Sequence, residues 1–254
     1  FEPMKIRQLI TSTLFALIIG LMAPMGAALA DTQSDIRIGN EALNDGEYET
    51  AFRLFNNALE FPDHPLSDEE RGRFLIYRGL TYNLLEQPEK SLIDLGNAIP
   101  LKQGEPTAYY NYGQTLLFLE KWKEAIPYFD KALQLRENYL YALLDRAHAY
   151  SQTDDTISML NDLNAVLFLE PENFDALYSL AIHFMNVRNL EEALKNIDLC
   201  IKSKPDADYL YIHRGAIYAA KDQPDKAYEN FKRAFDLGNR SEELLERLKE
   251  ETKG

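Results

Sequence analysis

Small and apolar residues recur along the chain in a constant phase. Small residues stand 40 residues apart once and then 34 residues apart four times, at Gly39, Gly79, Gly113, Ala147, Ala181 and Gly215. Sixteen residues after each of them comes a large apolar residue, at Phe55, Leu95, Phe129, Leu163, Ile197 and Phe231. Columns that keep their phase this long do not arise by chance, so the pattern predicts six repeats of one structural element.

Within each repeat, the apolar residues fall at the spacing of two amphipathic helices joined by a turn. Gly46 lies in one such turn, and Pro88 and Pro224 suit the first turn of a second helix. Six extra residues separate the first two repeats, where Ser67 followed by Glu70 forms a capping-box sequence. We therefore expect an all-α fold, with a short loop and an early helix start at this insertion.

The pattern resembles the tetratricopeptide repeat, a helix-turn-helix element of 34 residues, over residues 32 to 239. The resemblance implies a right-handed superhelical solenoid of about six repeats. We place the repeats at residues 32–65, 72–105, 106–139, 140–173, 174–207 and 208–240. The fourth is the least ideal, because Met159 replaces a small residue. Ser241 opens a last amphipathic helix in residues 241–254, which we expect to cap the solenoid.

The first thirty residues (1–30) have the order of a secretory signal peptide. Basic residues precede an uncharged stretch from Leu9 to Met22, and Ala28-Leu29-Ala30 ends the segment with small residues. We expect cleavage after Ala30 and a periplasmic or secreted mature protein of residues 31–254. The alternative is that residues 4–30 stay attached as an inner-membrane anchor, since the segment approaches the length of about 20 residues that spans a bilayer.

Charge and composition narrow the range of functions. The chain has 254 residues, with 41 acidic and 27 basic side chains and a formal net charge of -14. Nucleic acid is disfavoured as a partner, because phosphate binding needs clustered Lys and Arg. A charged fraction of 27% excludes a polytopic membrane protein.

Catalytic and metal-ligating patterns do not stand out in the sequence. The four histidines are scattered, the single Cys200 occupies a small core position, and neither a Gly-x-Ser-x-Gly nor a His-Glu-x2-His motif occurs. Carboxylates fall on helix faces and turns, where a solvated surface is their usual role. We therefore expect no enzyme activity, no cofactor, no metal and no small-molecule substrate.

The resemblance also implies that the first helix of each repeat lines a concave groove. At the corresponding positions the chain carries candidate partner-binding residues, namely Tyr77, Tyr110, Asn111, Gln114, Phe118, Tyr141, Asp145, His148, Tyr178, Tyr209 and His213. Tyrosine rings beside amides suit an extended peptide or a partner helix. The alternative is that some of these rings only pack against neighbouring repeats.

Three arginines precede the small residue of alternate repeats, at a position that is normally apolar: Arg78, Arg146 and Arg214. Sixteen residues later the same repeats carry polar residues, at Asp94, Asp162 and Asn230. This co-occurrence predicts a structural pair between the two helices of one repeat, which satisfies a partly buried guanidinium. The alternative is an arginine ladder that binds acidic ligands.

Together these features predict an exported, non-catalytic scaffold or adaptor that binds a protein or peptide in a Tyr-rich groove. One alternative is a membrane-anchored subunit of an envelope assembly or secretion complex, which would contact the membrane through its retained N-terminal segment. Another is an adaptor that delivers substrates to a cell-wall hydrolase or protease.

Overall fold

The computed structural model describes residues 30–62, 64–102, 104–241, 244 and 246–247, and these residues form α-helices without a strand. The chain divides after Asp155 into two compact units. The N-terminal unit contains α2 (Ala30–Asn44), α3 (Tyr48–Glu60), α4 (Asp68–Leu84), α5 (Pro88–Leu101), α6 (Pro106–Phe118), α7 (Trp122–Leu135) and α8 (Leu140–Gln152). The C-terminal unit contains α9 (Thr156–Leu169), α10 (Phe174–Asn186), α11 (Leu190–Ser203), α12 (Asp208–Ala220) and α13 (Pro224–Asp236).

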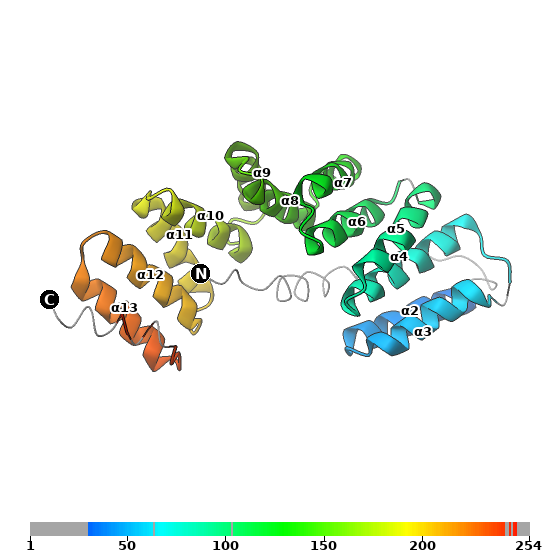
Figure 1. Ribbon diagram of the computed structural model, residues 1–254, viewed down its shortest axis with the longest axis horizontal. Coiled ribbons are helices and arrows are strands. Elements are labelled where there is room, and N and C mark those ends of the chain that lie inside the picture. The colour runs from blue at the N-terminus through cyan, green and yellow to red at the C-terminus, as the bar shows by residue number, and fades with distance from the viewer. Residues whose placement is uncertain (1–29, 63, 103, 242–243, 245, 248–254) are drawn as a thin grey trace. The chain divides into compact units, whose positions relative to one another are not determined.

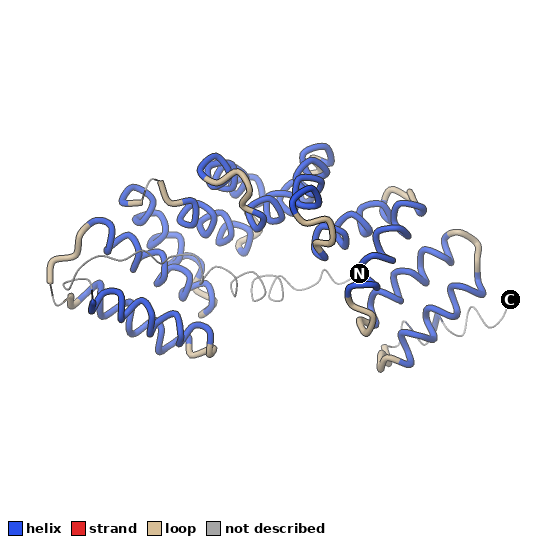
Figure 2. The backbone as a smooth tube through the Cα atoms, turned by 180° about the vertical axis from the view of Figure 1, so that it is seen from behind, coloured by secondary structure: helices blue, strands red, loops and turns tan. Residues whose placement is uncertain are grey.

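Consecutive helices pack side by side within each unit, as Figure 1 shows. The pairs α4–α5, α6–α7, α10–α11 and α12–α13 each correspond to one predicted repeat. Helices joined by short loops fill the described part of the chain (Figure 2). The prediction of an all-α repeat solenoid is therefore confirmed. The division of the chain falls inside the fourth predicted repeat, between α8 and α9.

The contact between the two helices of a repeat explains the period of the sequence. A Cβ atom added to Gly113 would stand 2.8 Å from Cε1 of Phe129, and one added to Gly215 would stand 2.5 Å from Cε1 of Phe231. Phe129 and Phe231 are buried in turn. The small residue on the first helix thus makes room for the large residue sixteen positions later on the second.

The turns inside the repeats have a second regularity that the sequence analysis missed. One residue of the turn has a positive φ, and these residues are Gly46, Glu86, Glu120, Asp154, Arg188 and Asp222. From Glu86 onward they are 34 residues apart. Only the first is glycine, so the left-handed conformation is imposed by the packing of the flanking helices and costs energy at the other five turns.

The predicted insertion forms a capped helix start. Ser67 Oγ accepts a hydrogen bond from the Glu70 N–H at 3.2 Å, and the Ser67 N–H donates to Glu70 Oε2 at 2.9 Å. Both halves of the capping box are present, which confirms the prediction from these two residues. The hydrogen bonds from Ser67 lower the pKa of Glu70, whose carboxylate accepts them.

Two predictions fall partly or wholly on residues that the structure does not describe. Residues 1–29 of the expected signal peptide lie outside the described residues, as does most of the expected cap. Of the cap, Leu244 packs into the core of the C-terminal unit, and its N–H donates to Ser241 Oγ at 3.4 Å. None of the described helices is both long enough and apolar enough to cross a membrane.

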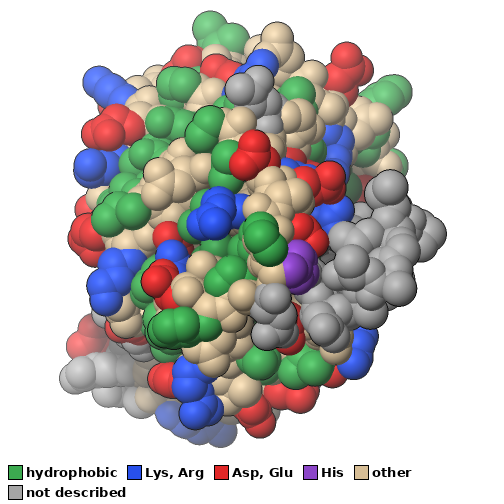
Figure 3. Space-filling model, turned by 90° about the vertical axis from the view of Figure 1, so that its right-hand side faces the viewer, with side chains coloured by type: hydrophobic (Ala, Val, Ile, Leu, Met, Phe, Trp, Pro, Cys, Tyr) green, Lys and Arg blue, Asp and Glu red, His purple; other side chains and the backbone are tan. Residues whose placement is uncertain are grey.

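Acidic and basic side chains are interspersed on the face of the molecule in Figure 3. Some pair on one helix, as Arg37 and Glu41 do at 2.7 Å on α2. Such exposed pairs contribute little to stability, so packing between helices holds the fold together.

Candidate functional site

Aromatic side chains of two first helices meet in the C-terminal unit. Tyr178 on α10 and His213 on α12 share a hydrogen bond of 2.9 Å between Oη and Nε2. The ring of Tyr209, also on α12, stands perpendicular to that of Tyr178 with centroids 5.8 Å apart. The ring of Phe174 stacks on that of Tyr178, with centroids 5.9 Å apart. Together with Asp175, we call these residues the α10–α12 cluster.

The α10–α12 cluster is partly exposed and carries polar atoms at its rim. All five of its side chains are intermediate in burial. Burial raises the pKa of Tyr178 to about 12, with the nearby Tyr209 adding to the effect, so its phenol is neutral at physiological pH. The cluster therefore offers apolar rings together with neutral hydrogen-bonding groups, which is the composition of many protein-binding surfaces.

In the N-terminal unit, the structure corrects the expectation that Tyr110 presents its ring to a partner. Tyr110 is fully buried, with its ring 4.9 Å from that of Tyr139 and 6.0 Å from that of Phe129. Its hydroxyl donates to Asp145 Oδ2 at 2.9 Å and accepts from Gln114 Nε2 at 2.8 Å. Burial raises the pKa of this phenol, and the charge of Asp145 adds to the effect. Tyr110 is therefore a hydrogen-bonded core residue.

Three more candidates of the N-terminal unit are buried like Tyr110. Asn111 is fully buried, Gln114 is 7% exposed, and Tyr77 is 7% exposed with its ring stacked on Phe55 at 5.4 Å. Asn111 and Gln114 are buried because of the position of α6, which packs on α5 and α7 and also contacts α4 and α8, whereas Tyr77 lies on α4, which packs on α3 and α5. Side chains that point from α6 toward these neighbours are covered on all sides, which a one-dimensional position number does not reveal.

The remaining candidates of this unit are partly exposed. They are Phe118 on α6 and Tyr141, Asp145 and His148 on α8. The His148 ring contacts Trp122 edge-on, with centroids 5.3 Å apart, and burial lowers its pKa from the ordinary value of 6.5. These four side chains are the part of the predicted surface that the N-terminal unit leaves accessible.

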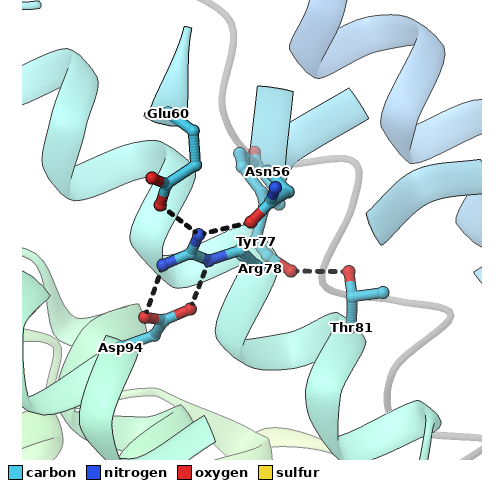
Figure 4. A network of polar contacts seen from close by, with 6 residues as sticks. All are labelled: Asn56, Glu60, Tyr77, Arg78, Thr81 and Asp94. Atoms are coloured by element: carbon cyan, nitrogen blue, oxygen red, sulfur yellow. Dashed lines mark hydrogen bonds and ion pairs between the residues drawn. The ribbon is translucent and has the colours of Figure 1, made fainter. Parts of the chain in front are cut away.

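The arginine in the second repeat makes the predicted pair. Arg78 on α4 donates from Nε to Asp94 Oδ2 at 2.7 Å and from Nη2 to Asp94 Oδ1 at 2.9 Å, a two-point contact between α4 and α5 (Figure 4). Burial alone would lower the pKa of Arg78, but the hydrogen bonds and charge of Asp94 outweigh it and raise the pKa. The Arg78 guanidinium therefore stays ionised.

Each of the three arginines also contacts the preceding repeat, which the sequence analysis did not predict. The acceptors directly follow the large apolar residue of that repeat, and the bonds are Arg78 to Asn56 at 2.8 Å, Arg146 to Asp130 at 2.6 Å and Arg214 to Asp198 at 2.8 Å. Arg214 also donates to Asn230 at 2.7 Å, as predicted. Asp162 belongs to the other unit from Arg146, so the pairing of these two residues stays a prediction. These contacts give the arginines a structural role that joins repeats.

The described residues offer little for catalysis or metal binding. They contain no group of three or more His, Cys, Asp or Glu side chains that could hold a metal ion. Cys200 is fully buried at a core position, as the sequence indicates. Burial raises the pKa of its thiol to about 12, so the reactive thiolate form is suppressed.

Comparison with known proteins agrees with the repeat pattern. Residues 106–139 match the family model of the tetratricopeptide repeat. The human mitochondrial import receptor subunit TOM70 is 25% identical over 188 residues, which cover 70% of this chain but 31% of that protein. The chain therefore spans about a third of the length of this relative.

Solved structures of repeat proteins share the fold. The type IV pilus biogenesis factor PilW has a TM-score of 0.74 and 22% identity, and the match covers 85% of this chain and 98% of that one. PilF of Pseudomonas aeruginosa has a TM-score of 0.73 and 16% identity, with 87% and 98% covered. At these identities the likeness concerns the fold alone.

Proposed function

We propose that this chain is a non-catalytic scaffold that binds a protein or peptide partner through the first helices of its repeats. The α10–α12 cluster carries the proposal, because it gathers partly exposed rings from two consecutive first helices. Aromatic residues dominate the binding energy of most interfaces, since they bury a large area at a small cost in side-chain entropy. The similarity to an import receptor subunit and to a type IV pilus biogenesis factor also supports a role in protein binding.

The accessible candidates of the N-terminal unit form a second part of the proposed surface. Tyr141, Asp145 and His148 lie on α8, and Phe118 ends α6. The buried Tyr110 donates a hydrogen bond to Asp145 and so fixes the position of this carboxylate in the surface. Partners would therefore contact Asp145 and the rings around it, while Tyr110 keeps the carboxylate in place.

A photo-crosslinking experiment tests this proposal. A photoreactive phenylalanine analogue replaces Tyr209 in the cluster, and in a matched protein it replaces Tyr228, which is a partly exposed tyrosine on the second helix α13. In cells we expect a discrete adduct from position 209, its loss when Tyr178 is changed to Ala, and no adduct from position 228. Equal adducts from both positions, or an adduct from 228 alone, would place the interface elsewhere.

The proposed location is the periplasm or the extracellular space, after cleavage behind Ala30. N-terminal sequencing of the protein from fractionated cells checks this. A start at Asp31 in the soluble envelope fraction supports export with cleavage. Recovery only in detergent, with residues 4–30 retained, would favour the membrane-anchored subunit of an envelope complex. The similarity to the type IV pilus biogenesis factor PilW is the observation that favours this second function.

A further inference from the structure

The α10–α12 cluster contains a carboxylate whose local charge balance is unusual. Asp175 is the second residue of α10 and is partly buried. Burial raises its pKa, and the charge of Lys204 opposes this effect only in part. The approach of a second cation stabilises the ionised form of such a carboxylate, because the added positive charge offsets the cost of removing the carboxylate from water.

Aromatic rings of the cluster lie near this carboxylate, whose charge contributes to the raised pKa of Tyr209. The Phe174 and Tyr178 planes are nearly parallel, at 6°, while the Tyr209 ring stands at 90° to that of Tyr178. The face of an aromatic ring carries a negative electrostatic potential, which attracts ammonium and guanidinium groups. A carboxylate near such rings is therefore suited to a cationic side chain with an apolar stem.

The protein's own lysine shows that a cation is attracted here. The Lys204 ammonium lies 3.6 Å from the centroid of the Phe174 ring. Lys204 follows the end of α11, where its backbone N–H bonds to the Cys200 carbonyl, and its side chain is exposed. A flexible, exposed side chain can move aside at little cost, so a cation from another molecule can take its place near Phe174 and Asp175.

We infer that the α10–α12 cluster receives a Lys or Arg side chain of the partner protein, between the Asp175 carboxylate and the rings of Phe174, Tyr178 and Tyr209. This inference rests on the proposed function and names the chemistry of the partner at that site. The net charge of -14 on the chain agrees with a basic partner segment, which it attracts over a longer range.

The test uses fluorescent peptides and the full chain. One peptide alternates Ala and Lys, a second carries norleucine in place of Lys, and fluorescence anisotropy measures binding at about 0.15 M salt, where long-range attraction is screened. We expect the Lys peptide to bind at least about tenfold more tightly than the norleucine peptide, because a partly desolvated cation gains both the ion pair and the ring contacts.

Matched variants separate the cluster from the general acidity of the surface. Asp175→Asn and Asp225→Asn remove the same charge, but Asp225 lies exposed on α13. We expect Asp175→Asn to weaken binding of the Lys peptide about tenfold and Asp225→Asn less than about twofold. Lys204→Gln removes the competing internal cation and is expected to tighten binding. Circular dichroism confirms that each variant is folded.

Two results would overturn the inference. Equal effects of Asp175→Asn and Asp225→Asn would mean that the peptide binds the acidic surface without using the cluster. Weaker binding after Lys204→Gln would mean that Lys204 helps to hold the ligand rather than competing with it. The crosslink from position 209 distinguishes the two proposals: if it persists while the peptides fail to discriminate, the scaffold function stands and the cation site does not.

Discussion

Removing Asp94 tests whether the pair of Arg78 with Asp94 stabilises the second repeat. The Asp94→Ala variant takes away both acceptors that face Nε and Nη2 of Arg78. The Arg78 side chain is 13% exposed and that of Asp94 is 6% exposed. In the variant, the guanidinium would therefore stay buried and charged without its nearest counter-charge. Water reaches the guanidinium poorly and does not replace that counter-charge.

The expected loss of stability follows from this burial. Breaking a buried ion pair from one side costs about 3 to 5 kcal/mol, because it leaves an uncompensated charge. Here Asn56 still accepts from Nη1 at 2.8 Å, and Glu60 stays 3.4 Å away with a side chain that is 57% exposed. These contacts offset part of the cost, so we expect a loss of about 2 to 3 kcal/mol, or roughly 4 to 12 °C in melting temperature.

Urea unfolding followed by far-UV circular dichroism measures the effect. Glu41→Ala is the matched control, since it removes an arginine contact of 2.7 Å whose two side chains are 57% and 58% exposed, and we expect a change below about 0.5 kcal/mol. The double change Arg78→Met with Asp94→Leu should recover much of the loss, because no buried charge remains. Equal midpoints for Asp94→Ala and Glu41→Ala would refute the structural role of the pair.

Three further predictions concern the core and its titration. Gly215→Ala should destabilise the fold by about 1 to 3 kcal/mol, because the new Cβ would stand 2.5 Å from Phe231. Gly96→Ala should stabilise α5 by about 0.5 to 1 kcal/mol, since its Cβ meets its nearest neighbour at 3.5 Å. Urea midpoints that move in the same direction for both variants would contradict this reasoning. Tyr110→Phe should lower the free energy of unfolding by about 1 to 2 kcal/mol, because the hydroxyl contacts are lost. Tyr110→Ala should lower it by about 3 to 5 kcal/mol, because the whole ring is lost from the core. If calorimetry finds Tyr110→Ala neutral, the ring is not a core element. Burial lowers the pKa of His148 below its unfolded value near 6.5, so its contribution to stability is present above about pH 6.5 and declines as the pH falls toward the folded pKa. The free energy of unfolding, measured at about pH 7.5 and about pH 5.5, should therefore depend less on pH in His148→Gln than in the native protein. Equal pH dependence would show that other groups are responsible.

The candidate site was predictable only in part. Tyr178, Tyr209 and His213 were selected from their positions in the repeat, and the structure brings them together in one partly exposed cluster. The same positions selected Tyr110 and Asn111, which are fully buried. Position in a repeat fixes the direction in which a side chain points from its own helix, whereas exposure depends on which neighbouring helices cover that direction.

The sequence alone determined the features that depend on contacts inside one repeat. One such feature is the contact of a small residue with a large one between the two helices of a repeat, and another is the pair of Arg78 with Asp94. Both contacts join residues sixteen positions apart, so they are visible as a periodic pattern in the chain. The tertiary structure decided what depends on neighbouring repeats. Examples are the acceptor that each arginine finds on the preceding repeat and the burial of Tyr110. These features depend on helices from different repeats packing together, and a pattern along one chain does not specify that packing.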